Sequence, residues 1–476
     1  MVFSSPVFLF LFLPITLLLY YAASSFGSMR ARNLVLLAVS ACFYAFGGLE
    51  CLCLLILSVI VNWTLGVLMI RHQRERGVKR VYFVIGLIYN ISILFFFKYL
   101  NLFADTGALL LGKLTGTEVL SPLPPIVLPI GISFFTFQIM SYLIDVYRGT
   151  VACQKNIWDL ALYIMLFPQL IAGPIVRYSD VETEIANRRS RLLDVYEGAY
   201  RFFVGFIKKV LLANAMGKAA DLAFVLPEGR GMVYAWAGLL CYSLQLYLDF
   251  WAYSDMAIGL GRIFGFHFPE NFNYPYTAKS IGEFWRRWHM TLSGWFRDYV
   301  YIPLGGNRNG LFKTCRNLMI VFALTGIWHG ANWTFLLWGI YYGIFLVLER
   351  IGLGAFLQRL PSFFRHAYVL LIVGLGWVLF RADGLSAAFG YIRDLFSGTL
   401  LGTHERELGE LLVGGKFQLQ LLISLLFCTP FFSGLYARLG KSRFAAVGDG
   451  IVLFFFFLAM CEMMAGSYNP FIYFRF

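Results

Sequence analysis

The chain has 476 residues, of which 59% are hydrophobic and 14% are charged, and its mean hydropathy is +0.70. Soluble domains carry about 25% charged residues, so this composition excludes a soluble globular protein and indicates a polytopic helical membrane protein. The net charge of +13 would suit nucleic-acid binding, but the basic residues fall between apolar segments instead of forming one patch, and we expect no nucleic-acid partner.

The first quarter of the chain predicts ordinary membrane spans. Segment 1–29 is uncharged, and basic residues follow it instead of preceding it, which is the wrong polarity for a cleavable signal peptide. We interpret it as a retained helix with its N-terminus outside. Loop 71–80 has five basic residues and one acid, whereas 104–125 has one basic residue and two acids, so the positive-inside rule places 71–80 in the cytoplasm and 104–125 outside. The spans expected around these loops are 33–48, 49–70 and 81–103.

From residue 126 the pattern becomes irregular. Prolines bracket a short apolar run at Pro168 and Pro174, and others crowd the entry to segment 126–146, at Pro122, Pro124, Pro125 and Pro129. Proline inside a span frees backbone groups that protein or water must satisfy, so these segments are expected to be buried or re-entrant. The charged stretch 177–201 is expected at the cytoplasmic surface.

Segment 283–308 alternates tryptophan with arginine, which is typical of an amphipathic segment at the headgroup level near the cytoplasmic face. Later spans are predicted at 317–327, 332–348, 366–381, 417–437 and 447–465.

The fold predicted from these segments is an all-α polytopic membrane protein with about 11 transmembrane helices and one or two re-entrant segments. We divide the chain into N-terminal helices at 1–125, a core with interfacial and re-entrant segments at 126–350, and C-terminal helices at 351–476.

His329 is the main candidate for chemistry. It lies in GIWHGANW within the 32 residues between Arg316 and Glu349, none of which is Asp, Glu, Lys or Arg. As one helix this run would be about 48 Å long against a hydrocarbon core of roughly 30 Å, so a break is expected, which Gly326, Gly330 and Asn332 would permit. An ionisable side chain beside irregular backbone at membrane depth is a functional-site candidate, here as a general base, although a histidine bonded to a backbone carbonyl is the alternative.

His289 is the second candidate, with Arg286 and Arg287 just before it. Two neighbouring cations would keep it neutral, but a surface histidine among lipid headgroups is the alternative. The arginines and Arg297 suit an anionic group such as a coenzyme A phosphate, or equally anionic lipid. Three further residues, Gln245, Asp249 and Tyr253, are spaced i, i+4 and i+8 and therefore share one face of a helix. Two hypotheses stay open for Asp249: it orients a histidine or a substrate hydroxyl, or it only marks the end of an uncharged run.

No metal site and no tightly bound cofactor are expected. The eight cysteines are scattered without a CxxC pair, and the sequence contains no GxxxxGK[ST] loop and no GxSxG elbow. The other histidines at 72, 366 and 404 are interpreted as loop residues without a chemical role.

The sequence resembles the membrane-bound O-acyltransferases, in particular the bacterial branch of alginate O-acetylation and its peptidoglycan- and cellulose-acetylating relatives. The resemblance covers nearly the whole chain in order. The matching stretches are SFFTFQIMSYLIDVYRG (133–149), FPQLIAGPIVRY (167–178), LYLDFWAYSDMAIGLGRIFGFHFPENFNYPY (246–276), EFWRRWHMTLSGWFRDYVYIPLGGNR (283–308), GIWHGANW (326–333) and SYNPFIYFRF (467–476). Two departures are Trp251-Ala252, where relatives often have Ser-Gly, and His267, where they often have Arg.

The resemblance implies a ring of tilted helices around a central funnel that leads to the family's essential histidine, which matches His329, and a second family histidine, which matches His289. The acyl donor would be acetyl-CoA or another cytoplasmic thioester. The acyl group would then cross the inner membrane to a periplasmic acetyltransferase partner and a polysaccharide acceptor.

On this basis we predict a multi-pass inner-membrane O-acyltransferase acting in exopolysaccharide O-acetylation. Asp249, Gln245, Asn332 and Trp328 would support the catalytic His329 and His289, and the donor would contact Arg286, Arg287, Trp288 and Arg297. Two other functions stay open: a polysaccharide export or transport subunit, which an inverted repeat would support, and a non-catalytic scaffold for a periplasmic acetylase.

Overall fold

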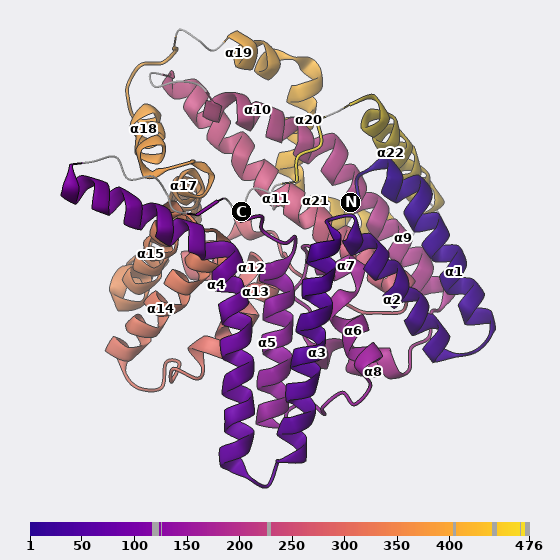
Figure 1. Cartoon of the computed structure of the whole chain (residues 1–476). Helices are drawn as coiled ribbons and strands as arrows, with labels where there is room; N and C mark the ends of the chain where they lie inside the picture. Colours follow the sequence, from indigo (N-terminus) through magenta and orange to yellow (C-terminus); the bar gives the residue numbers. More distant parts are fainter. Residues whose placement is uncertain are drawn as a thin grey trace. The chain divides into compact units, whose positions relative to one another are not determined.

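The protein is all-helical in its described part, which confirms the predicted fold class (Figure 1). The computed structural model describes residues 1–116, 123–124, 126–225, 230–402, 406–439, 445–466 and 468–471. Pro122, Pro125 and His404 lie outside these residues.

Two compact units divide the chain at other places than the three predicted regions. The first comprises Met1–Val195 with Gly261–Pro269, and the second comprises Tyr196–Leu260 with Glu270–Phe476.

Long apolar helices make up most of the first unit, in which α3, α4 and α5 pack side by side (Figure 1). Reciprocal amide hydrogen bonds between Asn62 and Asn90, at 2.7 and 3.3 Å, tie α3 to α4 inside the apolar interface. The helices of this unit are η1 (Phe8–Phe12), α1 (Leu13–Ser25), α2 (Met29–Ala45), α3 (Leu49–Arg71), α4 (Arg76–Thr115), α5 (Ile132–Arg148), α6 (Ile157–Met165), α7 (Phe167–Leu170) and α8 (Tyr178–Ala186).

The proline-bracketed run is buried, as predicted. Residues 160–176 are all buried, and the chain there breaks at Leu166 between the short helices α6 and α7. The prediction of a loop at 104–125 is wrong for its first part. No proline interrupts α4 there, so the helix continues to Thr115 and ends at Gly116, which is in the left-handed conformation.

The second unit holds the segments with the two candidate histidines, His289 and His329. It contains most of α9 (Leu192–Ile207), then η2 (Lys208–Ala213), α10 (Asn214–Val225), α11 (Met232–Ile263), η3 (Pro275–Thr277), α12 (Ile281–Arg287), α13 (Met290–Phe296), η4 (Arg297–Tyr301), α14 (Leu311–His329), α15 (Trp333–Leu348), η5 (Glu349–Leu353), α16 (Gly354–Gln358), α17 (Ser362–Arg381), α18 (Leu385–Leu395), α19 (Arg406–Val413), α20 (Gly415–Phe427), α21 (Phe431–Leu439) and α22 (Ala445–Ala465).

Fewer helices than predicted are long and apolar enough to cross a membrane. Seven of the described helices meet that condition, or eight if the bent pair of α19 and α20 forms one span, against the expected 11 or so. One predicted span, 417–437, is broken into α20 and α21. His366 is also helical and not a loop residue, since it lies in the first turns of α17.

Close backbone contact between α14 and α15 shapes the region around His329. A Cβ on Gly326 would lie 2.3 Å from the Phe335 carbonyl oxygen, and one on Gly339 would lie 2.2 Å from the Phe322 carbonyl oxygen. Small residues at such positions let membrane helices approach until their backbones touch.

An aromatic cluster fills the space where α12, α15 and α17 meet. The Trp285 ring is edge-on to Trp338 and Tyr342, with ring centroids 5.5 and 4.9 Å apart, and Trp288 packs on Trp377 at 4.9 Å. The tryptophans of the 283–308 segment therefore pack inside the protein, whereas we expected them at the lipid headgroups.

Substituting Gly326 with Val is expected to destabilise the protein strongly, since overpacking a filled interface costs about 1–3 kcal/mol and here the obstructing atom is backbone. Gly434→Ala on α21, where a Cβ meets nothing within 4 Å, is the matched control. Thermal unfolding of both variants in detergent measures the difference; equal midpoints would contradict the close packing of α14 on α15.

Candidate active site

His329 is the last residue of α14, where the chain breaks before α15. Gly330 leaves the helix in an extended conformation, and Asn332 caps α15 by accepting a hydrogen bond from the Thr334 backbone N–H at 3.1 Å. The predicted break is thus confirmed at residues 330–332, while Gly326 lies inside α14. Irregular backbone at membrane depth is tolerated only where protein buries it or where it borders a cavity, and this segment does border one.

Aromatic rings surround the His329 side chain, which is 8% exposed. The ring centroids of Trp328, Trp338 and Phe380 lie 5.0, 5.0 and 5.1 Å from the imidazole centroid. Such surroundings exclude bulk water and strengthen a hydrogen bond between the imidazole and a reacting group.

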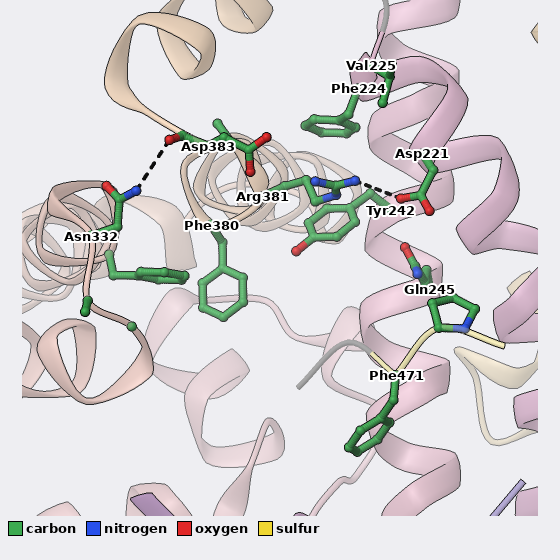
Figure 2. Close-up of a pocket in the computed structure, with 15 residues that line it drawn as sticks. Asp221, Phe224, Val225, Tyr242, Gln245, Asn332, Phe380, Arg381, Asp383 and Phe471 are labelled. Atoms are coloured by element: carbon green, nitrogen blue, oxygen red, sulfur yellow. Dashed lines mark hydrogen bonds and ion pairs between the residues drawn. The ribbon is translucent and has the colours of Figure 1, made fainter. Parts of the chain in front are cut away.

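A pocket of about 860 Å³ lies next to the chain break that follows α14 (Figure 2), and His329 itself is not among its lining residues. Gly330 lines it, as does Phe380, whose ring also contacts the His329 ring. The wall combines aromatic rings with polar groups that point inward, among them Gln245, Asn332, Asp383 and the 2.7 Å ion pair between Arg381 and Asp221. Its volume is within the range of small-molecule sites.

The C-terminal segment forms one wall of this pocket. Pro470 and Phe471 line it, and the Lys209 ammonium donates to the Pro470 carbonyl oxygen. Tyr468 also donates from its hydroxyl to Asp221 at 2.7 Å. Part of the terminal motif is therefore held at the pocket by hydrogen bonds to η2 and α10.

The three residues predicted to share a face of α11 have different surroundings. Gln245 lines the pocket, and its buried Oε1 has no hydrogen-bond partner in the described part of the chain. Asp249 is buried and pairs with Lys209 at 2.8 Å, so its carboxylate faces an ammonium and not a histidine. Tyr253 packs on Phe471, with ring centroids 4.8 Å apart.

His289 is fully buried in the bend between α12 and α13, and the alternative of a surface histidine is wrong. Its Nδ1 lies 2.9 Å from the Asn271 Oδ1, and burial lowers the pKa of the imidazole to about 3. Neutrality was predicted, but its cause is burial and not the two arginines. Trp328 contacts both histidines, with its ring centroid 6.2 Å from that of His289.

The residues predicted to hold the donor are divided between surface and interior. Arg286 and Arg297 are exposed and Arg287 is half-buried, with Arg287 paired to Glu283 at 2.9 Å and Arg297 to Asp298 at 2.7 Å. Trp288 is buried in the aromatic cluster, where its ring stacks on that of Phe284, with centroids 5.5 Å apart.

Similar proteins identify the family. Residues 154–380 match the family model of membrane-bound O-acyltransferases. A probable alginate O-acetylase AlgI of Pseudomonas putida is 40% identical over the full length of both chains. A peptidoglycan O-acetyltransferase of Helicobacter pylori is 36% identical over 87% of this chain and 83% of its own. A teichoic acid D-alanyltransferase of Bacillus subtilis is 29% identical over 46% of this chain and 58% of its own.

The chain belongs to the membrane-bound O-acyltransferase family. It is a multi-pass membrane protein and an acyltransferase, as predicted.

Several residues at the acyltransferase site were not predicted from the sequence. Lys209 and Arg381 each pair with an acidic residue near the pocket, and Asn271 contacts His289. The signal for Lys209 was present in the sequence, since two consecutive lysines stand in segment 202–217, which has no other charged residue. Asn271 gave no such signal, because a polar residue in a proline-containing loop is ordinary.

Replacing Lys209 with Met is expected to lower the free energy of unfolding by about 3–5 kcal/mol, because it removes the cation that pairs with the buried Asp249 carboxylate. The double variant Lys209→Met/Asp249→Asn removes both charges and is expected to recover most of that loss. Denaturant unfolding in detergent, with the exposed Lys218→Met as control, measures the effect. A single variant as stable as Lys218→Met would contradict the pair.

Acid is expected to destabilise the wild type through His289. The unfolded chain binds a proton there below pH 6.5, whereas the folded chain does so only near pH 3, so stability rises with pH between these values. As the pH falls below 6, the free energy of unfolding of the wild type should decrease relative to that of His289→Gln, by up to about 1.4 kcal/mol for each pH unit. Unfolding of both proteins from pH 4 to 7 measures this slope, with His72→Gln as the control; parallel curves would show that the buried histidine takes up protons freely.

Proposed function

We propose that this acyltransferase takes an acetyl group from acetyl-CoA on the cytoplasmic side of the bacterial inner membrane and transfers it toward an alginate-like exopolysaccharide on the other side. The observation that carries the proposal is the position of His329, at the end of a broken membrane helix and beside a pocket with aromatic and polar walls. Two relatives, a probable alginate O-acetylase and a peptidoglycan O-acetyltransferase, support an acetyl group and a polysaccharide acceptor.

His329 acts as the general base in this proposal. It accepts the proton of an acceptor hydroxyl while the hydroxyl oxygen attacks the thioester carbonyl carbon. The new C–O bond forms as the C–S bond breaks, and the leaving thiolate takes up the proton that the imidazole had received. The imidazole then returns to its neutral form.

The pocket is the acceptor site in this proposal. α14 begins next to the basic 283–308 segment and runs 19 residues to His329, a rise of about 28 Å. That distance nearly spans a hydrocarbon core, and the same basic segment also reaches the far end of α14, where its His289 contacts Trp328. The pocket's aromatic rings, Phe335 and Phe380, and its polar side chains, Gln245 and Asn332, suit an acceptor that carries a hydroxyl group, from which the acetyl group then passes on toward the polysaccharide.

The donor approaches from the basic side. Arg286 is the exposed arginine of α12 and is available to a coenzyme A phosphate. Arg287 and Arg297 already pair with Glu283 and Asp298, so each would bind the phosphate either in place of its acidic partner or together with it. Asp249 then acts indirectly, through Lys209 and the C-terminal segment. We further infer that a periplasmic acetyltransferase completes the transfer to the polysaccharide.

His329→Ala is expected to abolish O-acetylation of the secreted polysaccharide, because the acceptor hydroxyl loses its base. Proton NMR of the polysaccharide measures the acetyl content, at membrane levels of the protein matched by immunoblot. His72→Ala, which removes an imidazole that contacts the Leu68 backbone carbonyl, should leave acetylation at the wild-type level. Unchanged acetylation in His329→Ala would favour the scaffold or transport function instead.

A further inference from the structure

A strained turn positions the second histidine. Segments 271–273 and 287–290 pair through the Asn273 N–H to the Arg287 carbonyl and the Met290 N–H to the Asn271 carbonyl, both at 2.9 Å. Within the described part of the chain, the non-glycine residues with positive φ are Tyr274, at 46°, and His289, at 43°. Both belong to this turn. Such backbone costs on the order of 1–3 kcal/mol per residue and persists only where its surroundings hold it.

Asn271 holds His289 with its side chain as well as its backbone. Its Oδ1 lies 2.9 Å from the His289 Nδ1 and accepts a second hydrogen bond from the Thr291 hydroxyl, also at 2.9 Å. Its Nδ2 donates to the Ser254 hydroxyl at 3.0 Å. Asn271, Ser254 and His289 are each only about 1% exposed, so water does not compete for these bonds.

This arrangement determines which imidazole nitrogen carries the proton. A carbonyl oxygen only accepts, so the His289 Nδ1 must be the donor and the Nε2 of the neutral ring carries a lone pair. The Nε2 is buried and has no hydrogen-bond partner in the described residues. The rings packed on the imidazole are Phe250 and Trp328, neither of which titrates, with centroids 4.7 and 6.2 Å away.

We propose that Asn271 is a positioning residue for acyl transfer, which fixes His289 in the Nδ1–H tautomer so that its Nε2 serves as a hydrogen-bond acceptor in the site. The proposal rests on the proposed function. It assigns the two histidines different tasks: His329 moves the proton, whereas His289 presents a fixed, buried acceptor nitrogen and donates no proton to the leaving sulfur.

The tautomer is measured by nitrogen NMR on the full-length protein labelled with ¹⁵N-histidine in lipid nanodiscs. The chain has six histidines, and the spectrum of His289→Gln assigns the signal of interest. In the wild type we expect a protonated Nδ1 and a bare Nε2 at neutral pH. A protonated Nε2 with a bare Nδ1 would overturn the proposal.

Two variants separate positioning from folding. Asn271→Ala removes the acceptor and should give a mixture of tautomers, with polysaccharide acetylation reduced on the order of 10-fold to 100-fold. Asn271→Asp keeps the acceptor oxygen, so it should keep the Nδ1–H form, but its negative charge should raise the pH below which the Nε2 also becomes protonated. The exposed Asn273→Ala, in the same turn, should match the wild type in every measurement.

If Asn271→Ala and Asn273→Ala give the same tautomer and the same acetyl content, the assignment of Asn271 is wrong. The same holds if Asn271→Asp leaves the protonation of the Nε2 unchanged. Acetylation that does not depend on His329 would instead refute the proposed function. The NMR spectra report the tautomer of His289 independently of activity, so they distinguish that result from an error in the role assigned to Asn271.

Discussion

The site depends on one constraint: backbone that leaves helical geometry inside an apolar run must be enclosed by protein. The break at residues 330–332 satisfies it in three ways. Gly326 and Gly339 bring α14 and α15 into backbone contact just below the break, Asn332 satisfies the first amides of α15, and the aromatic cluster covers the remaining side. Because these contacts fix both helix ends, the side chain of His329 has little freedom, which is what a catalytic base requires.

Buried charges fix the wall on the other side of the pocket. Lys208 and Lys209 are consecutive residues of the π-helical η2, and they pair with Asp255 and Asp249 on α11. The wider turn of a π-helix is often found at functional sites, and here it turns both ammonium groups toward one helix. The Lys208 ammonium also lies 3.3 Å from the centroid of the Trp251 ring. This cation–π contact gives a physical reason for tryptophan at a position where relatives often have serine.

The other departure also has a local explanation. His267 donates from Nδ1 to the Glu184 carboxylate, 2.7 Å away, and an arginine at the same place would meet the same carboxylate. It belongs to the first unit, whereas both candidate catalytic histidines belong to the second. The substitution at 267 therefore changes a surface pair and not the chemistry of the site.

The sequence predicted the all-helical fold class and the helix break beside His329, since a long uncharged run with glycines leaves few structural solutions. It overestimated the spans, because apolar segments such as 417–437 are broken by turns, and hydropathy averages over a break. The sequence pattern also suggested Trp288 as a donor contact. An alternation of tryptophan and arginine does not reveal whether the tryptophan rings face lipid or the protein interior. Lys209 and Asn271 were missed because their partners, Asp249 and His289, are distant in the sequence and only tertiary packing joins them.

The two histidines differ in what surrounds them, and that difference is the strongest argument for separate tasks. The His329 ring touches Phe380, which lines the pocket, and the next residue, Gly330, lines the pocket as well. His289 is packed on Phe250 and fixed by Asn271 in a strained backbone. A general base must gain and lose a proton within each turnover, so it needs access to the reacting groups. A hydrogen-bond acceptor with a fixed orientation is instead made stronger by burial and by a rigid backbone. Trp328 contacts both rings, so the proposed base and the proposed acceptor share one indole neighbour.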